Sequence, residues 1–242
     1  MIRFENVHKS FGPKKVLNGL SLSIQRGEIF FMLGRSGTGK SVSLKHLVGL
    51  LTPDSGKIWI DDTEISQFSE NQFVPIRKKC GLVFQLPALV DSRSLYENLV
   101  LGIRHLDAVQ KLARISATLK AVGLESLEKD LFERFPPSLS YGEQKRLALA
   151  RTLLPDPEIL LYDEPTTGLD PTTSLQIHDL IKKISKDFGK TSIVVSHDMR
   201  NALKIADRLA VLDAGRVVDL GTPEEIRRSP VAMTMAFMED LQ

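Results

Sequence analysis

Apolar and polar positions over residues 2–33 alternate in the manner of short β-strands. The pattern predicts strands at Ile2–Val7, Leu20–Gln25 and Glu28–Leu33. Turn-forming residues separate them at Phe11-Gly12-Pro13 and at Arg26-Gly27. The chain is therefore expected to begin with an antiparallel β portion.

After this portion, apolar segments of strand length alternate with segments of helical periodicity. The predicted elements are, in chain order, a helix at Lys40–Leu50, strands at Lys57–Ile60 and Cys80–Phe84, a helical region over 94–126, a helix at Tyr141–Leu154, a strand at Ile159–Tyr162, a helix at Thr172–Phe188, a strand at Ser192–Val195, a helix at Met199–Ile205, and a hairpin of Arg208–Leu212 with Arg216–Leu220. This alternation predicts the α/β class with a mostly parallel core sheet. Residues 1–242 are expected to form a single domain, with a helical subdomain from about 86 to 155 inserted in the core.

A glycine-rich phosphate-binding loop follows the third predicted strand. The residues Gly34-Arg35-Ser36-Gly37-Thr38-Gly39-Lys40-Ser41 match the pattern Gly-x-x-x-x-Gly-Lys-Ser/Thr between an apolar strand and a helix. Glycines let backbone N–H groups turn toward phosphates, and the following helix directs its positive end at the anion. Lys40 is expected to reach the β- and γ-phosphates of ATP, and Ser41 to hold Mg²⁺.

A pair of acidic residues ends a second apolar strand. Ile159–Tyr162 precedes Asp163 and Glu164, which places both carboxylates at the edge of the sheet where ligands collect. Asp163 is the expected Mg²⁺ partner, directly or through water. Glu164 points elsewhere, and we expect it to act as the general base on the attacking water. The sequence therefore predicts ATP hydrolysis in an α/β core of the P-loop NTPase type.

Composition narrows the classes of protein that remain. The 242 residues are 42% apolar, and 32 Lys and Arg nearly balance 30 Asp and Glu, so nothing indicates nucleic acid as a partner. Cys80 is the only cysteine, which excludes an internal disulfide and favours a small core residue in a reducing compartment. The longest apolar run, Ile29–Leu33, is far short of the roughly 20 residues of a membrane-spanning helix. Any membrane-spanning part is therefore expected on a separate chain.

Leu139-Ser140-Tyr141-Gly142-Glu143-Gln144 lies between the phosphate loop and the acidic pair, and it resembles the signature Leu-Ser-Gly-Gly-Gln of the ATP-binding cassette (ABC) ATPases. The resemblance covers essentially the whole chain. It implies that Ser140 and Gly142 face the γ-phosphate bound to a second copy. A serine hydroxyl, a glycine N–H and a helix N-terminus form a suitable anion site. The resemblance thus implies a homodimer that closes around ATP.

The same resemblance assigns roles to further residues. Gln85, which follows a strand, corresponds to the glutamine that contacts Mg²⁺ and water beside the membrane partner. His197 corresponds to the histidine that contacts the γ-phosphate, and Asp170 to the acid of the loop that crosses the dimer interface. Phe11 corresponds to the aromatic residue that stacks on adenine, with a core or turn phenylalanine as the alternative.

One position departs from the family pattern. Tyr141 stands where ABC ATPases usually have glycine. The ring is expected to be tolerated beside the γ-phosphate site if it points outward along the following helix.

Two segments are similar to the ATPases of bacterial lipid-transport systems of the Mla type. They are Ser41–His46 and Phe84–Ser92, the latter ending in Ala88-Leu89-Val90-Asp91-Ser92 where that subgroup has Ala-Leu-Phe-Asp-Ser. The resemblance implies phospholipid transport, a separate integral-membrane permease, an MCE-type lipid-binding protein, and a peripheral position on the cytoplasmic face of the inner membrane. Apolar residues after Gln85 suit a groove that receives a permease helix.

Other classes of cassette remain as alternatives. The first is the ATPase subunit of an importer for amino acids, metals or other small solutes. A soluble cassette acting on ribosomes or DNA is disfavoured, because the chain holds one cassette and only 100 residues separate Lys40 from Ser140. A degenerate cassette is disfavoured because Lys40, Asp163, Glu164 and His197 are all present.

The end of the chain is rich in methionine. Val231–Gln242 contains Met233, Met235, Phe237, Met238 and Leu241. Packing on its own domain is the favoured interpretation, and contact with a partner is the alternative.

Overall fold

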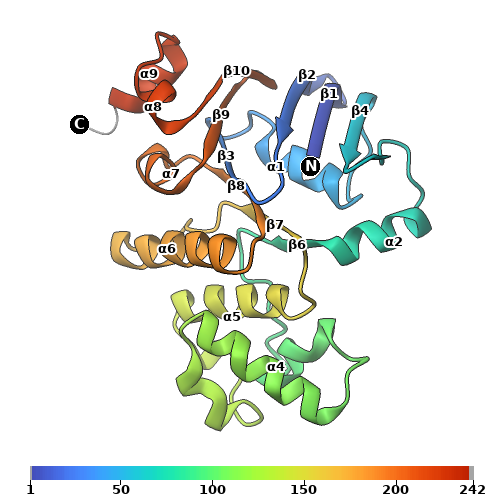
Figure 1. Ribbon diagram of the computed structural model, residues 1–242, viewed down its shortest axis with the longest axis vertical. Helices are drawn as coiled ribbons and strands as arrows, with labels where there is room; N and C mark the ends of the chain where they lie inside the picture. The colour runs from blue at the N-terminus through green and yellow to red at the C-terminus, as the bar shows by residue number, and fades with distance from the viewer. Residues whose placement is uncertain (1, 240–242) are drawn as a thin grey trace.

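The computed structural model describes residues 2–239, which form two β-sheets with helices around them (Figure 1). The first sheet has the strand order β2-β1-β4-β5. Its strands are β1 (Ile2–Phe11), β2 (Lys14–Ile24), β4 (Ser55–Ile60) and β5 (Thr63–Glu64). β1 pairs antiparallel with both β2 and β4, which confirms the predicted antiparallel portion. The hairpin of β1 and β2 extends farther than predicted, because backbone pairing continues through polar residues up to Phe11 and Lys14.

The second sheet is the core of the molecule, with the order β10-β9-β3-β8-β7-β6. Its strands are β3 (Ile29–Leu33), β6 (Cys80–Val83), β7 (Ile159–Asp163), β8 (Thr191–Ser196), β9 (Arg208–Asp213) and β10 (Arg216–Gly221). The first five run parallel to one another, and β10 pairs antiparallel with β9. Every residue of β3 is buried, as expected for a central parallel strand. The predicted α/β class with a mostly parallel sheet is confirmed.

Helices flank this sheet and gather at the end of the molecule where α4 and α5 lie (Figure 1). The α-helices are α1 (Lys40–Leu47), α2 (Glu70–Lys79), α3 (Leu95–Leu99), α4 (Ala108–Ala121), α5 (Tyr141–Leu153), α6 (Pro171–Asp187), α7 (Met199–Ile205), α8 (Pro223–Arg227) and α9 (Ala232–Glu239). Short 3-10 turns lie at η1 (Val100–Gly102), η2 (Glu125–Asp130) and η3 (Pro136–Ser138). Between β6 and β7 the chain contains only helices and loops. The division into a core and a helical subdomain from about 86 to 155 stays a prediction.

Three helix predictions differ from the structure. The predicted helix to Leu50 ends at Leu47, because Gly49 takes φ 69° and the N–H of Leu50 reaches the carbonyl of Lys45. The helical region over 94–126 is interrupted, since Asp107 caps a new helix by accepting from the Gln110 N–H at 2.8 Å. Helix α2 was not predicted at all. It buries only two apolar side chains, which gives its sequence little helical periodicity.

Two apolar clusters lie on opposite faces of the core sheet. Ile29, Phe31 and Leu33 of β3 belong to the cluster under α3–α7, whereas Phe30 and Met32 belong to the cluster under the antiparallel sheet. Successive side chains of β3 thus point to opposite faces of the sheet and pack in different apolar clusters. The partly buried apolar residues of α9, which pack against the first cluster, are Met233, Phe237 and Met238. This confirms that the methionine-rich segment packs on its own domain; Leu241 lies outside the described residues.

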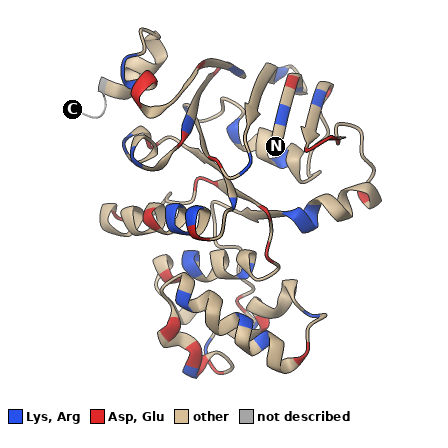
Figure 2. Ribbon diagram, in the orientation of Figure 1, with Lys and Arg blue, Asp and Glu red and all other residues tan. Residues whose placement is uncertain are grey.

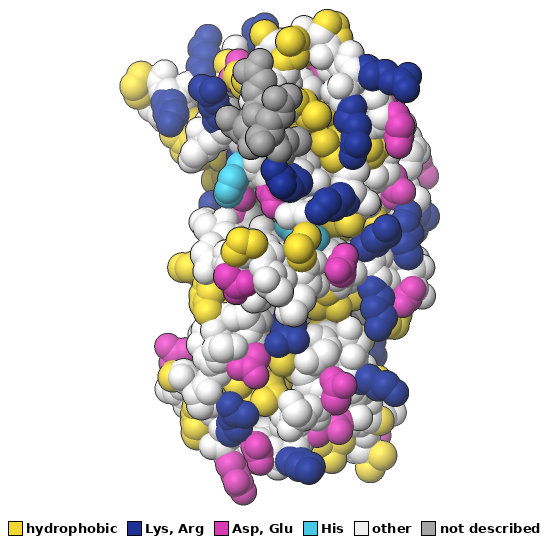
Figure 3. Space-filling view, turned by 90° about the vertical axis from the view of Figure 1, so that its left-hand side faces the viewer, with side chains coloured by type: hydrophobic (Ala, Val, Ile, Leu, Met, Phe, Trp, Pro, Cys, Tyr) yellow, Lys and Arg dark blue, Asp and Glu magenta, His cyan; other side chains and the backbone are white. Residues whose placement is uncertain are grey.

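Surface features agree with the composition. Figure 2 shows Lys and Arg interspersed with Asp and Glu along the described chain, and the face in Figure 3 carries side chains of both signs. Cys80 is partly buried against the second apolar cluster, and burial raises the pKa of its thiol to about 12, which disfavours a reactive thiolate. No helix within residues 2–239 combines the length and the apolar character needed to cross a bilayer.

Candidate active site

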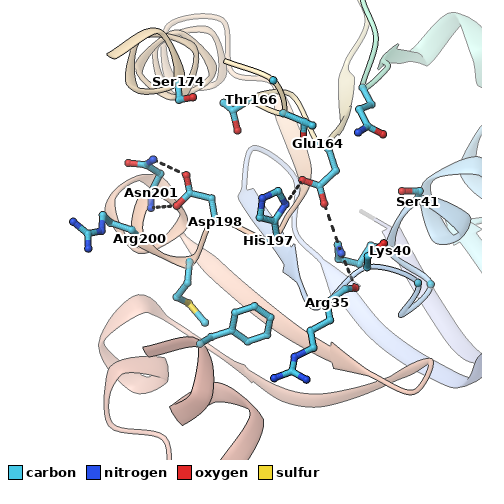
Figure 4. Close-up of a pocket in the computed structure, with 18 of the residues that line it drawn as sticks. Arg35, Lys40, Ser41, Glu164, Thr166, Ser174, His197, Asp198, Arg200 and Asn201 are labelled. Atoms are coloured by element: carbon cyan, nitrogen blue, oxygen red, sulfur yellow. Dashed lines mark hydrogen bonds and ion pairs between the residues drawn. The ribbon is translucent and has the colours of Figure 1, made fainter. Parts of the chain in front are cut away.

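A cleft of about 1450 Å³ opens where three neighbouring strands of the core sheet end. The phosphate loop follows β3, Glu164 follows β7 and His197 follows β8. Since the carboxyl ends of parallel strands meet at one edge, segments far apart in the sequence line one cleft. Figure 4 shows Lys40, Ser41, Glu164 and His197 around it.

The phosphate loop is shaped by glycines at points of close approach. A Cβ atom on Gly39 would lie 2.5 Å from Leu17 Cδ2 and 2.8 Å from the carbonyl oxygen of Val16, and Gly39 has φ 101°. Only glycine fits there, so the loop packs directly on β2 before α1 begins. The loop residues that line the cleft are Arg35, Ser36, Gly37, Gly39, Lys40 and Ser41. Gly34 and Thr38 lie behind it, where the Thr38 hydroxyl donates to the Arg35 carbonyl at 2.9 Å.

Lys40 is nearly buried, with 5% of its side chain exposed, and its ammonium is held within the loop. Lys40 Nζ donates to the carbonyl oxygens of Gly34 at 2.7 Å and Arg35 at 3.1 Å. Burial lowers the pKa of Lys40, and the nearby carboxylate of Glu164 opposes that shift. The Lys40 ammonium is thus held in a fixed position at the cleft, where it can donate hydrogen bonds to a bound phosphate.

Two of the three residues predicted to hold Mg²⁺ are hydrogen-bonded to each other, since Ser41 Oγ donates to Asp163 Oδ1 at 2.6 Å. Ser41 and Gln85 line the cleft, and Asp163 does not. Among residues 2–239 no cluster of three His, Cys, Asp or Glu side chains forms a metal site. The available donors are a hydroxyl, a carboxylate and an amide, which suit a hard cation completed by phosphate oxygens. This donor set fits Mg²⁺ bound with a nucleotide.

Glu164 is placed between a cation and an imidazole. Its backbone has φ 48°, its Oε1 lies 3.6 Å from Lys40 Nζ, and its Oε2 lies 2.8 Å from His197 Nδ1 (Figure 4). The left-handed backbone turns the side chain back toward the phosphate loop after β7 ends. A carboxylate at this position is able to accept a proton from a water molecule beside a bound phosphate.

Ser140 and Gly142 do not line this cleft. Ser140 caps α5: its hydroxyl accepts from the Glu143 N–H at 3.3 Å and donates to Glu143 Oε2 at 2.7 Å. A Cβ atom on Gly142 would lie 2.9 Å from Thr173 Cγ2, so the start of α5 packs against the start of α6. In one copy of the chain, the residues predicted to face the phosphate of a second copy therefore do not line the cleft that holds Lys40 and Glu164.

Tyr141 packs more closely than expected. Its Cε1 lies 3.3 Å from the position of a Cβ atom on Gly168, and Lys145 Nζ lies 5.4 Å from the ring centroid. The ring, which is 36% exposed, thus contacts the Gly168 turn and lies near a cation of its own helix. Burial lowers the pKa of Lys145 to about 8, which the carboxylate of Glu164 partly opposes.

Phe11 and Asp170 occupy different kinds of position. Phe11 is 46% exposed at the end of β1 and lines the cleft, so a core role is excluded, whereas a role in the turn to β2 stays an alternative to adenine stacking. Asp170 caps α6, where Oδ1 accepts from the Thr173 N–H at 3.0 Å. It lies beside the cleft-lining residues Gly168 and Pro171 without lining the cleft itself.

Several cleft residues were not predicted from the sequence. They include Lys14, Val16, Thr166, Thr167, Ser174, Leu175, Asp198, Arg200, Asn201, Lys204 and Phe237. Position in the sequence was a signal for some of them, because Asp198 directly follows His197, and Arg200 and Asn201 begin the next helix. Asp198, for example, caps α7 by accepting from the Asn201 N–H at 3.0 Å.

Comparison with known proteins identifies the family. The family model described as "ABC transporter" matches residues 17–167, which include the phosphate loop, the signature and the acidic pair. The chain belongs to the ABC transporter family. It is accordingly an ATP-binding cassette and an ATPase that uses ATP and Mg²⁺.

Similar curated proteins are 38% identical to this cassette over the aligned residues. The methionine import ATP-binding protein MetN of Carboxydothermus hydrogenoformans is 38% identical, over 95% of this chain and 68% of that protein. MetN of Rhizobium johnstonii is also 38% identical, over 96% of this chain and 64% of its own length. The chain thus spans about two thirds of the length of these relatives.

Solved structures of cassettes superpose closely. The ATP-binding cassette MJ0796, in a dimeric post-hydrolysis state bound to ADP and Pi, gives a TM-score of 0.82 at 32% identity over 92% of this chain and 99% of that one. The protein cbiO1 of Clostridium perfringens, part of the transporter complex cbiONQ, gives a TM-score of 0.84 at 30% identity. The superposition covers 100% of this chain and 98% of cbiO1. None of these relatives supports the predicted resemblance to lipid-transport ATPases, which stays a prediction.

Proposed function

We propose that this cassette powers a membrane transporter by closing, as a homodimer, around two ATP–Mg²⁺. The observation that carries the proposal is that Ser140 and Gly142 do not line the cleft that holds the other predicted site residues. Lys40, Glu164 and His197 meet in one cleft, whereas Ser140 and Gly142 lie elsewhere at the start of α5. Head-to-tail association of two copies brings each surface against its complement.

In this proposal each ATP lies between two chains. One chain supplies Lys40, Ser41, Gln85, Asp163, Glu164 and His197, and the other supplies Ser140 and Gly142. Phe11 stacks on the adenine. ATP favours the closed dimer because it contacts both chains only in that state, and hydrolysis removes this preference. The dimeric state of the structural relative MJ0796 with ADP and Pi supports this arrangement.

For the cargo, we favour a small solute, with an amino acid as the first candidate. The support is the similarity over nearly the whole chain to methionine import proteins. The membrane-spanning part is then a separate permease, and a solute-binding protein delivers the cargo. The cassette lies peripherally on the cytoplasmic face of the cell membrane.

Lipid transport with an MCE-type partner is the second candidate. The segment after Gln85 favours it, because its sequence from Ala88 to Ser92 is similar to that subgroup. The exposed apolar residues in this segment, Phe84, Leu86 and Val90, suit a groove for a permease helix in either kind of transporter.

We expect a tagged chain, isolated from its native membranes in gentle detergent, to retain a multi-span permease together with a solute-binding protein. Partners are identified by mass spectrometry. An MCE-type protein beside the permease would support the lipid candidate, and ribosomes without any membrane protein would contradict transport.

A matched pair of variants locates the docking surface in the same experiment. Leu86→Glu places a charge on a side chain that is 68% exposed after Gln85, and we expect it to release the permease. Phe188→Glu alters a residue that is 54% exposed at the end of α6, and we expect it to retain the permease.

A further inference from the structure

Lys145 is a buried cation one turn into α5 that the proposed ATP site does not use. Only 3% of the residue is exposed. Its ammonium donates to the backbone carbonyl of Gln85 at 2.6 Å and to that of Pro165 at 3.0 Å. Both of its close acceptors are backbone carbonyls of loops that border the cleft.

The two carbonyls belong to segments that carry proposed active-site groups. Gln85 follows β6, and Pro165 directly follows Glu164. The loop from 84 to 90 is largely exposed, so apolar packing holds it weakly. Polar contacts from α5 hold it instead: besides Lys145, Arg151 donates to the carbonyls of Ala88 at 2.7 Å and Pro87 at 3.3 Å.

The same ammonium lies beside Tyr141 at the start of α5. Its distance of 5.4 Å from the ring centroid is within the range of a cation–π contact. Tyr141 in turn rests on the Gly168 turn. Lys145 therefore links three segments that are distant in sequence: the start of α5, the turn after Glu164, and the Gln85 loop.

Burying an ammonium in such a place is costly unless its donors are satisfied. An apolar side chain of similar length would fill the space without that cost. The presence of a lysine at this buried position is thus most simply explained by the two backbone carbonyls that its ammonium holds in place.

We propose that Lys145 is a positioning residue that couples the start of α5 to Gln85. Through it, the helix whose N-terminus addresses the partner's ATP fixes the backbone of Gln85 and Pro165 at its own ATP. This inference rests on the proposed role of Gln85 and on the proposed dimer.

The test compares steady-state ATP hydrolysis by the full chain with three single variants. Lys145→Met removes the donors at similar length, and we expect kcat to fall about tenfold while the KM for ATP changes less than about threefold. Lys145→Gln keeps amide donors, and we expect it to recover kcat to within about threefold of the wild type. Arg146→Met removes a neighbouring cation that donates to Gly123 instead, and we expect wild-type kinetics.

A second measurement does not depend on activity. We expect amide hydrogen exchange, followed by mass spectrometry, to be faster over residues 84–90 in Lys145→Met and in Lys145→Gln to a smaller extent, and unchanged in Arg146→Met. If Lys145→Met does not fold, the Lys145→Gln comparison decides the question by the same exchange rates.

Unchanged kcat and unchanged exchange in the Lys145 variants would overturn the proposal. So would an equal loss of kcat in Arg146→Met, or a change in KM alone. Absence of hydrolysis by the wild-type chain would instead contradict the ATPase function. The exchange comparison would still show whether Lys145 holds the loop at residues 84–90 in place.

Discussion

Replacing Glu164 by Gln is expected to slow ATP hydrolysis by about 100- to 10,000-fold, the usual contribution of a general base. The amide retains the size of the side chain and a hydrogen-bond acceptor, but it cannot take a proton from water. Lys40, Ser41 and Asp163 remain, so ATP binding persists. Chains therefore accumulate as an ATP-bound dimer.

Hydrolysis is measured by phosphate release, and the dimer by size-exclusion chromatography with and without ATP–Mg²⁺. Glu133→Gln provides the control, since Glu133 is an exposed carboxylate outside the cleft. A Glu164→Gln chain that stays monomeric with ATP and hydrolyses it normally would exclude Glu164 as the base.

Lys40→Met is expected to weaken ATP binding by about 10- to 150-fold, the equivalent of about 1.5–3 kcal/mol for a hydrogen bond to a charged group. The substitution removes the ammonium that the loop carbonyls hold at the floor of the cleft. Hydrolysis falls as well, because the same cation stabilises charge on the phosphates during the reaction.

Isothermal titration calorimetry measures the ATP dissociation constant directly. Lys45→Met is the matched control, because Lys45 lies on the same helix but does not line the cleft. Equal ATP affinity in Lys40→Met and Lys45→Met would remove Lys40 from the phosphate site.

The core sheet and the edge that carries the site were predictable because they depend on local sequence. An apolar strand followed by glycines, or by Asp163 and Glu164, specifies both the buried element and the polar residues at its end. Parallel neighbours then bring those ends together without further information. The ion pair of Glu164 with Lys40 follows from this geometry.

Features that depend on contacts between distant segments were not predictable. The early part of β2 is held by pairing with β1, and α2 is held by burial of Phe73 and Ile76. A capping box of Ser69 and Gln72 was the local signal for α2 that periodicity alone did not reveal. The contact of Lys145 with Gln85 joins residues 60 positions apart, so only the folded chain exhibits it.

The cargo is the part of the function that the cassette determines least. The lipid-transport prediction depended on short segments, Ser41–His46 and Phe84–Ser92, whereas the similarity to methionine importers extends over nearly the whole chain. Residues 84–90 are largely exposed. If they contact a permease, as proposed, their sequence reflects that partner as well as the cassette fold.

The most direct test of the composite site mixes two inactive variants, Lys40→Met and Ser140→Arg. If each ATP lies between two chains, a mixed dimer unites the intact Lys40 of one chain with the intact Ser140 of the other. We predict that mixing restores hydrolysis to about one quarter of the wild-type rate, since about half of random dimers are mixed and each has one intact site. A mixture that hydrolyses ATP no faster than the sum of its two components would contradict the proposed dimer.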